Sequence, residues 1–239
     1  MTGKSINLNG VRVYIGRLQN HGLVHFSSSE MNGVSQTFPY FHNSALNYAI
    51  SGMENFISTG TVPAYALDWE GEFMRFPVYV LPAHPLHQPQ YQLLNKATVD
   101  DVHMTPNCIE RINSPSLMMV SYLDTYCQPR GGFWTAAFVF EPDFNLPAVF
   151  RLGKRDTPIR AKWKLVENPV VFFSEDAVSV SHLVNPLDVA GDFQEGIPIA
   201  MPPHFLMNQV VIANDYFLQY NEKGSIHIPQ IVLKRIHLL

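Results

Sequence analysis

The sequence predicts an α+β fold in which strands outnumber helices, and two patterns carry that prediction. The first is an alternating apolar segment near the N-terminus, followed by one amphipathic helical segment. The second is a series of short apolar runs through the rest of the chain, separated by scattered proline and glycine residues. A strand, a helix and then several strands fit a ferredoxin-like core with β-rich insertions.

The first strand and the main helix have the clearest patterns. Residues 11 to 16 alternate between apolar and other side chains, which is typical of a half-buried strand. A polar loop over residues 27 to 36 follows. Apolar residues between 41 and 57 then recur at helical spacing, and Asn43 or Ser44 is the expected N-cap because its side-chain oxygen can accept a bond from a free backbone N–H.

Later runs are rich in β-branched and aromatic residues and predict further strands. One run is ambiguous, because Phe205, Val210 and Ala213 have the spacing of a second helix over residues 202 to 214, whereas a continuous apolar run also fits a strand. The strand predictions cover residues 76–81, 117–123, 134–140, 148–152, 170–173, 178–182 and 226–233.

Length and composition indicate one soluble domain. The chain has 239 residues, of which 46% are hydrophobic, and it shows no internal repeat and no linker-like segment. Residues 1 to 10 are polar, and no run of eighteen apolar residues occurs, so we expect a cytoplasmic protein with no membrane partner. Cys108 and Cys127 are not in CxxC spacing, and the HxxH of residues 84–87 contains a proline; we therefore expect no metal and no cofactor.

A basic segment is the strongest functional signal. Six of the sixteen Lys and Arg residues lie between positions 151 and 164, against one acid, Asp156, and Gly153 lets the backbone approach a ligand closely. Such a segment suits phosphate oxygens, and RNA or DNA is the expected partner. The alternative is a basic face that contacts only solvent. The net charge of -4 does not exclude binding of a nucleic acid, because salt screens the electrostatic field of the chain to a short range. The cations are Arg151, Lys154, Arg155, Arg160, Lys162 and Lys164.

Two other segments are candidates for RNA contact. In residues 128 to 134, a glycine-rich turn that contains Arg130 leads into Trp134. The ring of Trp134 can stack on a base. A tight turn with a buried Trp134 fits the sequence equally well. His42 and Asn43 stand at the start of the expected helix, where free N–H groups favour an anion. Ordinary N-capping explains Asn43 nearly as well.

Three motifs, in this order, resemble those of the Csc1 family, the Cas5-type RAMP subunit of the type I-D CRISPR effector complex (Cascade). Residues 40–49, YFHNSALNYA, resemble the family's Y-L-H-N-x-A-L-x-Y-A helix start. Residues 146–163 read L-P-x-x-x-R-L-G-K, six further residues and A-K-W. Residues 182–188, HLVNPLD, resemble the H-P-L-N-P-L-D turn. The chain departs from the pattern at Leu183, where proline is usual, and at Arg155, where tryptophan is common.

The resemblance implies an RRM/RAMP-type fold and a role in antiviral defence. Such a subunit binds the 5′ handle of the guide CRISPR RNA and caps a filament of backbone subunits beside the large subunit. Target DNA near the protospacer-adjacent motif is an implied neighbour. The family also carries a thumb or hairpin, which we expect to be inserted around residues 105–135 of a single domain spanning residues 1–239. Exposed apolar residues such as Met118, Met119 or Phe205 are candidates for subunit docking, although such residues are more often core.

Two other functions stay open. Related Cas5-type proteins of another subtype cleave precursor RNA, and metal-independent cleavage needs a general base and a general acid, for which His21, His25 and His42 are available. Because ten histidines make such candidates easy to find, and because systems of this type have a separate processing enzyme, we expect a non-enzyme. A β-rich structural or interaction protein without nucleic acid is the third possibility.

Overall fold

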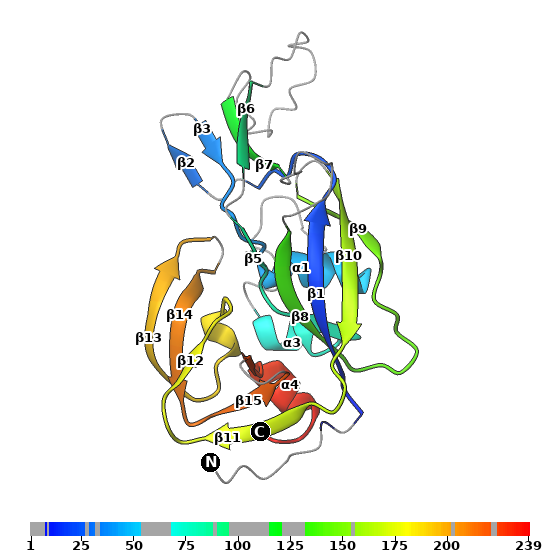
Figure 1. Cartoon of the computed structure of the whole chain (residues 1–239), viewed down its shortest axis with the longest axis vertical. Coiled ribbons are helices and arrows are strands. Elements are labelled where there is room, and N and C mark those ends of the chain that lie inside the picture. Colours follow the sequence, from blue (N-terminus) through cyan, green and yellow to red (C-terminus); the bar gives the residue numbers. More distant parts are fainter. Residues whose placement is uncertain are drawn as a thin grey trace.

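The protein is β-rich, and its described residues form four antiparallel or mixed sheets and a few short helices (Figure 1). The computed structural model describes residues 8, 10–26, 29–31, 34–53, 68–87, 90–95, 115–120, 132–153, 156–201, 204–220 and 224–239. Strands dominate these residues, as the sequence predicts, and the architecture is compatible with the α+β class.

The largest sheet is antiparallel and is built around the N-terminal strand β1. Strand β1 pairs with β8 on one side and with β10 on the other. In spatial order the strands are β4 (Val78–Val80), β8 (Phe133–Val139), β1 (Arg12–Asn20), β10 (Thr157–Leu165) and β9 (Val149–Leu152), and β5 (His84–Pro85) also pairs with β8.

Helix α1 (Asn43–Ser51) covers one face of this sheet. Its Leu46 and Ile50 pack with the inward side chains of β1, β4 and β10, including Leu18, Val80 and Ile159. From Gly16 to Asn20 and from Thr157 to Ala161, the buried positions follow the period of two that is typical of a strand with one covered face.

Gly16 lets the sheet accept a tryptophan on this face. A Cβ atom at Gly16 would lie 2.3 Å from Cζ3 of Trp163 and 2.9 Å from Cγ2 of Thr135. The Trp163 ring is held in place by a hydrogen bond from its Nε1 to the carbonyl oxygen of Pro147, at 3.0 Å. The ring therefore occupies the space that a side chain on β1 would need.

Two three-stranded sheets form the C-terminal half of the chain, with β11, β15 and β16 in one sheet and β12, β14 and β13 in the other. Helix α4 (Gln230–Arg235) ends this half, and a short turn of 3-10 helix, η2 (Pro186–Asp188), precedes β13. The strands are β11 (Val170–Ser174), β12 (Val178–Val180), β13 (Asp192–Ile199), β14 (Leu206–Ala213), β15 (Asp215–Gln219) and β16 (Ser225–His227).

The C-terminal half covers part of the second face of the large sheet. Val13 of β1 and Phe138 of β8 share one apolar core with Val171 of β11, Leu218 of β15 and Val232 of α4. Helix α3 (Trp69–Phe73) contributes to the same core. The remaining part of this second face is not covered by that core.

A fourth sheet lies at one end of the molecule (Figure 1). Most of the thumb expected around residues 105–135 lies outside the described residues, which include only β7 and the start of β8 from this region. The strands of the fourth sheet, in spatial order, are β2 (Ser29–Met31), β3 (Val34–Gln36), β7 (Pro115–Val120) and β6 (Gln90–Asn95).

One open choice is decided and two local predictions are corrected. Of the helix and the strand that fitted residues 202–214, the described residues form the strand: Leu206–Ala213 is β14, which has buried apolar residues on both faces. The strand expected over residues 226–233 ends at His227, and helix α4 begins after Pro229, which is its N-cap. The N-cap of α1 is His42 rather than Asn43 or Ser44, and Gly52 ends this helix in the left-handed conformation.

Within the described residues, no helix is long and apolar enough to cross a membrane.

Candidate nucleic-acid interface

Strand β10 presents its cations on one face. Thr157, Ile159 and Ala161 are buried, whereas every second residue from position 160 to position 164 is exposed. Successive side chains of a strand point to opposite faces, so this alternation places the cations together. Across the described part of the chain, none of these three cations is in ion-pair contact with a carboxylate. The exposed cations of β10 are Arg160, Lys162 and Lys164.

Neighbouring strands add two further cations to this face. Arg17 of β1 lies directly opposite Lys162 and is exposed. Arg151 of β9 is also exposed and lies opposite Pro158. Pro158 is two residues before Arg160 on β10, so both point to the same face of the sheet. Because paired residues of antiparallel strands share a face, these side chains form one surface. We name it the basic face; it consists of Arg17, Arg151, Arg160, Lys162 and Lys164.

Trp134 borders the basic face. It lies on β8 directly opposite Arg17, and its side chain is half-buried. The ring stacks on His182, with centroids 5.7 Å apart and planes at 25°, and its centroid lies 5.2 Å from that of His84. Much of the ring is thus engaged within the protein, at the point where the C-terminal half meets the large sheet.

Gly153 has a defined local role in the turn that joins β9 to β10. Its φ of +81° is one that residues with a side chain rarely adopt, and an added Cβ would lie 2.8 Å from the carbonyl oxygen of His25. The close backbone approach that Gly153 permits is therefore to His25. Lys154 and Arg155, like Arg130, lie outside the described residues.

His42 and Asn43 lie at the start of α1, which packs on the face opposite to the basic face. Nδ1 of His42 accepts a hydrogen bond from the backbone N–H of Ser44 at 3.1 Å. Burial, and after it the nearby His204, lowers the pKa of His42 to about 3, so its ring is neutral near pH 7. The structure therefore separates these two residues from the cations of β10.

Asn43 joins two of the three sequence motifs in one buried polar cluster. Its Nδ2 donates to Oη of Tyr79 at 2.9 Å and to Oδ2 of Asp188 at 3.1 Å. Its Oδ1 accepts from Nδ2 of Asn185 at 3.2 Å. The helix start at residues 40–49 and the turn at residues 182–188 thus hold each other in place.

Asp188 is the electrostatic centre of this cluster. Tyr79 donates its hydroxyl proton to Oδ1 of Asp188 at 2.5 Å. Burial of the carboxyl group raises its pKa to about 7, although the hydrogen bonds from Tyr79 and Trp69 act in the opposite direction. Burial likewise raises the pKa of the Tyr79 hydroxyl, and the neighbouring Asp188 adds to that shift.

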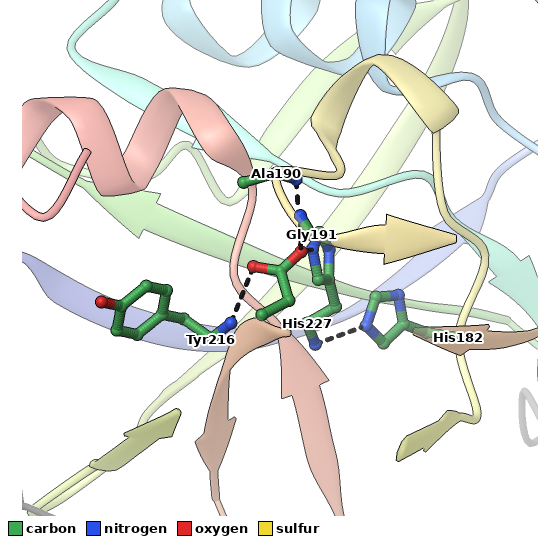
Figure 2. A network of polar contacts seen from close by, with 6 residues as sticks. His182, Ala190, Gly191, Tyr216 and His227 are labelled. Carbon is green, nitrogen blue, oxygen red and sulfur yellow. Dashed lines mark hydrogen bonds and ion pairs between the residues drawn. The ribbon is translucent and has the colours of Figure 1, made fainter. Parts of the chain in front are cut away.

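A second buried network stabilises the C-terminal half (Figure 2). Nε2 of His227 lies 3.1 Å from Oδ2 of Asp215, which also accepts from the backbone N–H of Gly191 at 2.8 Å. The backbone N–H of His227 donates to Nε2 of His182 at 3.1 Å, so the proton of the neutral His182 ring is on Nδ1, which faces the carbonyl oxygen of Leu183. Burial lowers the pKa of His182 to about 3.

Asp215 in this network stays ionised despite its burial. Burial alone would raise its pKa. The hydrogen bond and charge attraction of His227, together with the backbone N–H groups of Gly191 and Tyr216, outweigh burial, so the pKa lies below its usual value. These contacts connect β15, β16 and the start of β13, so the network is structural.

Residues 11–234 match the family model described as type I-D CRISPR-associated protein Cas5/Csc1. The chain belongs to this Cas5/Csc1 family. No curated protein matches the sequence. The match spans the large sheet, both C-terminal sheets and most of α4, so membership in the family covers every element described above except the end of the chain.

Sequence reasoning on this Cas5/Csc1 chain missed Arg17. Its signal was present, since the alternation of Val13 and Ile15 continues to position 17, where a cation replaces an apolar residue. A cation at an apolar position of a strand indicates the point where its covered face becomes exposed. The partner Lys162 could not be inferred, because the pairing register of β1 and β10 is not visible in the sequence.

Proposed function

We propose that the chain is a non-catalytic subunit of the type I-D effector complex that holds the 5′ handle of the guide CRISPR RNA on its basic face. The observation that carries this proposal is the row of five cations on three adjacent strands. Asp156 is the one acid between residues 151 and 164, and its carbonyl oxygen accepts a hydrogen bond from Arg151 at 2.9 Å. A groove or face that binds single-stranded RNA needs such a row of cations along the phosphate backbone.

The pairing of Arg17 with Lys162 supports an anionic ligand. Like charges directly opposite each other on neighbouring strands destabilise a sheet. A phosphate placed between the two side chains would offset that repulsion and gain charge-assisted hydrogen bonds.

The strand order supports the finer fold that we propose, a ferredoxin-like RRM/RAMP-type core. The order β10-β1-β8-β4 is antiparallel throughout, and α1 lies in sequence between β1 and β4, as in that fold. Strand β9 lies in the connection between β8 and β10. Helix packing on one face leaves the other for RNA, which is how RRM sheets bind it. We extend the proposal to a single domain over residues 1–239 with a thumb around residues 105–135.

The remaining sequence candidates fit this proposal in two ways. Trp134 borders the cations and can contact a base only with the part of its ring that His182 and His84 leave exposed. We assign His42 and Asn43 a positioning role, because both are buried in the core of the fold. Lys154, Arg155 and Arg130 complete the proposed RNA contacts. Family membership supports the partners: the backbone and large subunits, and target DNA near the protospacer-adjacent motif.

RNA retention at increasing salt tests the basic face. We expect the double change Arg160→Gln and Lys162→Gln to weaken binding of handle RNA about tenfold or more, because two phosphate contacts are lost. The slope of log affinity against log salt should fall by about 0.7 for each cation removed. Filter binding of a labelled single-stranded handle RNA measures both quantities.

The matched control is Arg75→Gln, which removes an exposed cation in the turn after α3 that pairs with Glu72 at 2.5 Å. This control should leave the salt slope unchanged. Equal affinities for the double variant and the control across the salt series would overturn the proposal.

The non-catalytic part of the proposal has its own test. Cleavage without metal requires an accessible acid and base, and His42 is buried and neutral. We expect repeat RNA incubated with the protein in EDTA to stay intact on a denaturing gel. Specific cleavage that disappears with His21→Ala or His25→Ala would instead assign endoribonuclease activity to the chain.

A further inference from the structure

The charge of the chain changes sign after the basic segment. Between Val166 and Leu233 the sequence has eight Asp or Glu residues and only one cation, Lys223. The described acids of this stretch that lie at the surface include Asp192 and Glu195, both on β13. A surface of this charge repels a polynucleotide and attracts a positively charged partner.

The same stretch exposes apolar side chains. Six of the ten large apolar residues that are exposed in the described part of the chain lie between Val170 and Phe205. On β13, Ile197 is 54% and Phe193 is 40% exposed, and Phe205 beside the end of this strand is 51% exposed. Ile197 shares its face of β13 with Glu195, because their partners Asn208 and Val211 lie on one side of β14, whereas Phe193 lies opposite Ile212 on the other side. An apolar side chain and an acid therefore stand together on one exposed face.

Strand β13 contributes little to the core. Six of its eight residues are exposed, and the two that are not, Gly196 and Ile199, are only half-buried. In an antiparallel sheet one face of a strand normally packs on the core, so a long strand exposed on both faces is unusual. In Figure 1, β13 forms one side of the molecule, away from β9 and β10.

The edge of β13 does not suit the addition of another strand. Its register against β14 shifts between Phe193 and Glu195 and again between Glu195 and Ile197. Pro198 has no N–H, and bulges, charges and proline are the features that prevent edge-to-edge pairing. A partner therefore contacts the side chains of β13 rather than extending its sheet.

We propose that the β13 surface, the face of this strand that carries Asp192, Glu195 and Ile197, docks a segment of another protein subunit that carries Lys or Arg next to apolar side chains. Ile197 packs against the apolar residues, and Glu195 pairs with the cations. This inference rests on the proposed function in that it takes the chain to be a subunit of an effector complex. It does not depend on the basic face binding RNA.

Site-specific photocrosslinking in the assembled complex tests this inference. Ile197 is replaced by p-benzoylphenylalanine, and in a matched variant the same amino acid replaces Val149, which is 58% exposed and lies opposite Arg160 on the sheet. After irradiation, we expect position 197 to link to a protein subunit, within a segment that contains Lys or Arg. Position 149 should link to RNA.

The two positions fail independently. A link from position 197 to RNA or to a second copy of this chain, or no link in a complex that has assembled, overturns the docking inference whatever position 149 does. Absence of an RNA link from position 149, with position 197 linked to protein, counts against the proposed RNA site alone.

A charge change confirms the chemistry of the partner. Glu195→Lys should lower the crosslinking yield at position 197 several-fold, because a repulsion replaces an attraction, while RNA retention stays unchanged. Asp143→Lys is the control, since Asp143 is an exposed acid in the loop after β8. Equal yields for Glu195→Lys and the control would show that the surface does not select a cationic partner.

Discussion

Replacing Gly16 with alanine is expected to destabilise the protein by about 3 kcal/mol or more. The new Cβ would lie 2.3 Å from the ring of Trp163, and the ring cannot withdraw without losing its bond to Pro147. The strain falls on β1, the central strand of the large sheet, so it also affects the pairing with β8 and β10. Denaturant unfolding followed by circular dichroism measures the change.

A double-mutant cycle identifies the cause of this effect. Trp163→Leu removes the part of the ring that meets the new Cβ, so Gly16→Ala should then cost less than about 1 kcal/mol in that background. If the single variant does not fold, recovery of soluble protein in the double variant reports the same coupling. A similar loss in both backgrounds would place the strain elsewhere.

The second prediction concerns the pH dependence of stability around Asp188. Its pKa in the folded protein is about 7, against 3.8 for a free carboxyl group, so the folded state holds a proton that the unfolded state has released. This group alone makes the free energy of unfolding fall as pH rises from about 4 to 7. The stabilisation is complete below about pH 4 and is lost at higher pH.

Two buried histidines act with the opposite sign. His42 and His182 have pKa values of about 3 in the folded state against 6.5 when free, so the unfolded state binds the extra protons. Their contributions are complete above pH 6.5 and are lost as pH falls toward 3. Between about pH 4 and 6.5, the unfolded state binds the two protons of the histidines, whereas the folded state binds the one proton of Asp188. For these three groups together, the free energy of unfolding therefore rises with pH.

Asp188→Asn is therefore expected to steepen the pH dependence. Removing the opposing proton should increase the slope of unfolding free energy against pH by about 1.4 kcal/mol per unit between about pH 4 and 6.5. The absolute stability also changes, because the new amide meets Nδ2 of Asn43, so the slope is the quantity to compare. Urea unfolding at several pH values measures it.

The control for this experiment is Asp143→Asn, which alters an exposed carboxyl group. Its slope should match that of the unchanged protein. If Asp188→Asn gave the same slope as well, the carboxyl group of Asp188 would be ionised in the folded state throughout this range.

Side-chain alternation made several strands predictable. The period of two in residues 11–16 and the apolar runs that became β8 and β11 each correspond to a strand with a buried face. The same alternation predicts that Arg160, Lys162 and Lys164 share one face, as they do on β10. The alternation of side chains between two faces depends only on the local backbone conformation, so it can be read from the sequence without knowing what the strand packs against.

Features set by distant contacts were not predictable. The residues of β14 have a helical spacing, but they become a strand because β12 and β13 pair with them on both sides. His42 and Asn43 have the residue types of an anion site, yet Nδ1 of His42 is engaged by Ser44 and the side-chain amide of Asn43 by Tyr79, Asn185 and Asp188, of which only Ser44 is close in sequence. The position of Arg17 beside Lys162 likewise depends on register.

Strand β10 separates two demands on one short stretch of sequence. Its inward residues Ile159 and Ala161 are fixed by packing beneath α1, whereas its outward residues are free to vary with the ligand. Substitution along the outer row can therefore retune affinity with little effect on folding. Deletion of one residue within β10 would exchange the two rows, burying charge and exposing the apolar side chains in a single step.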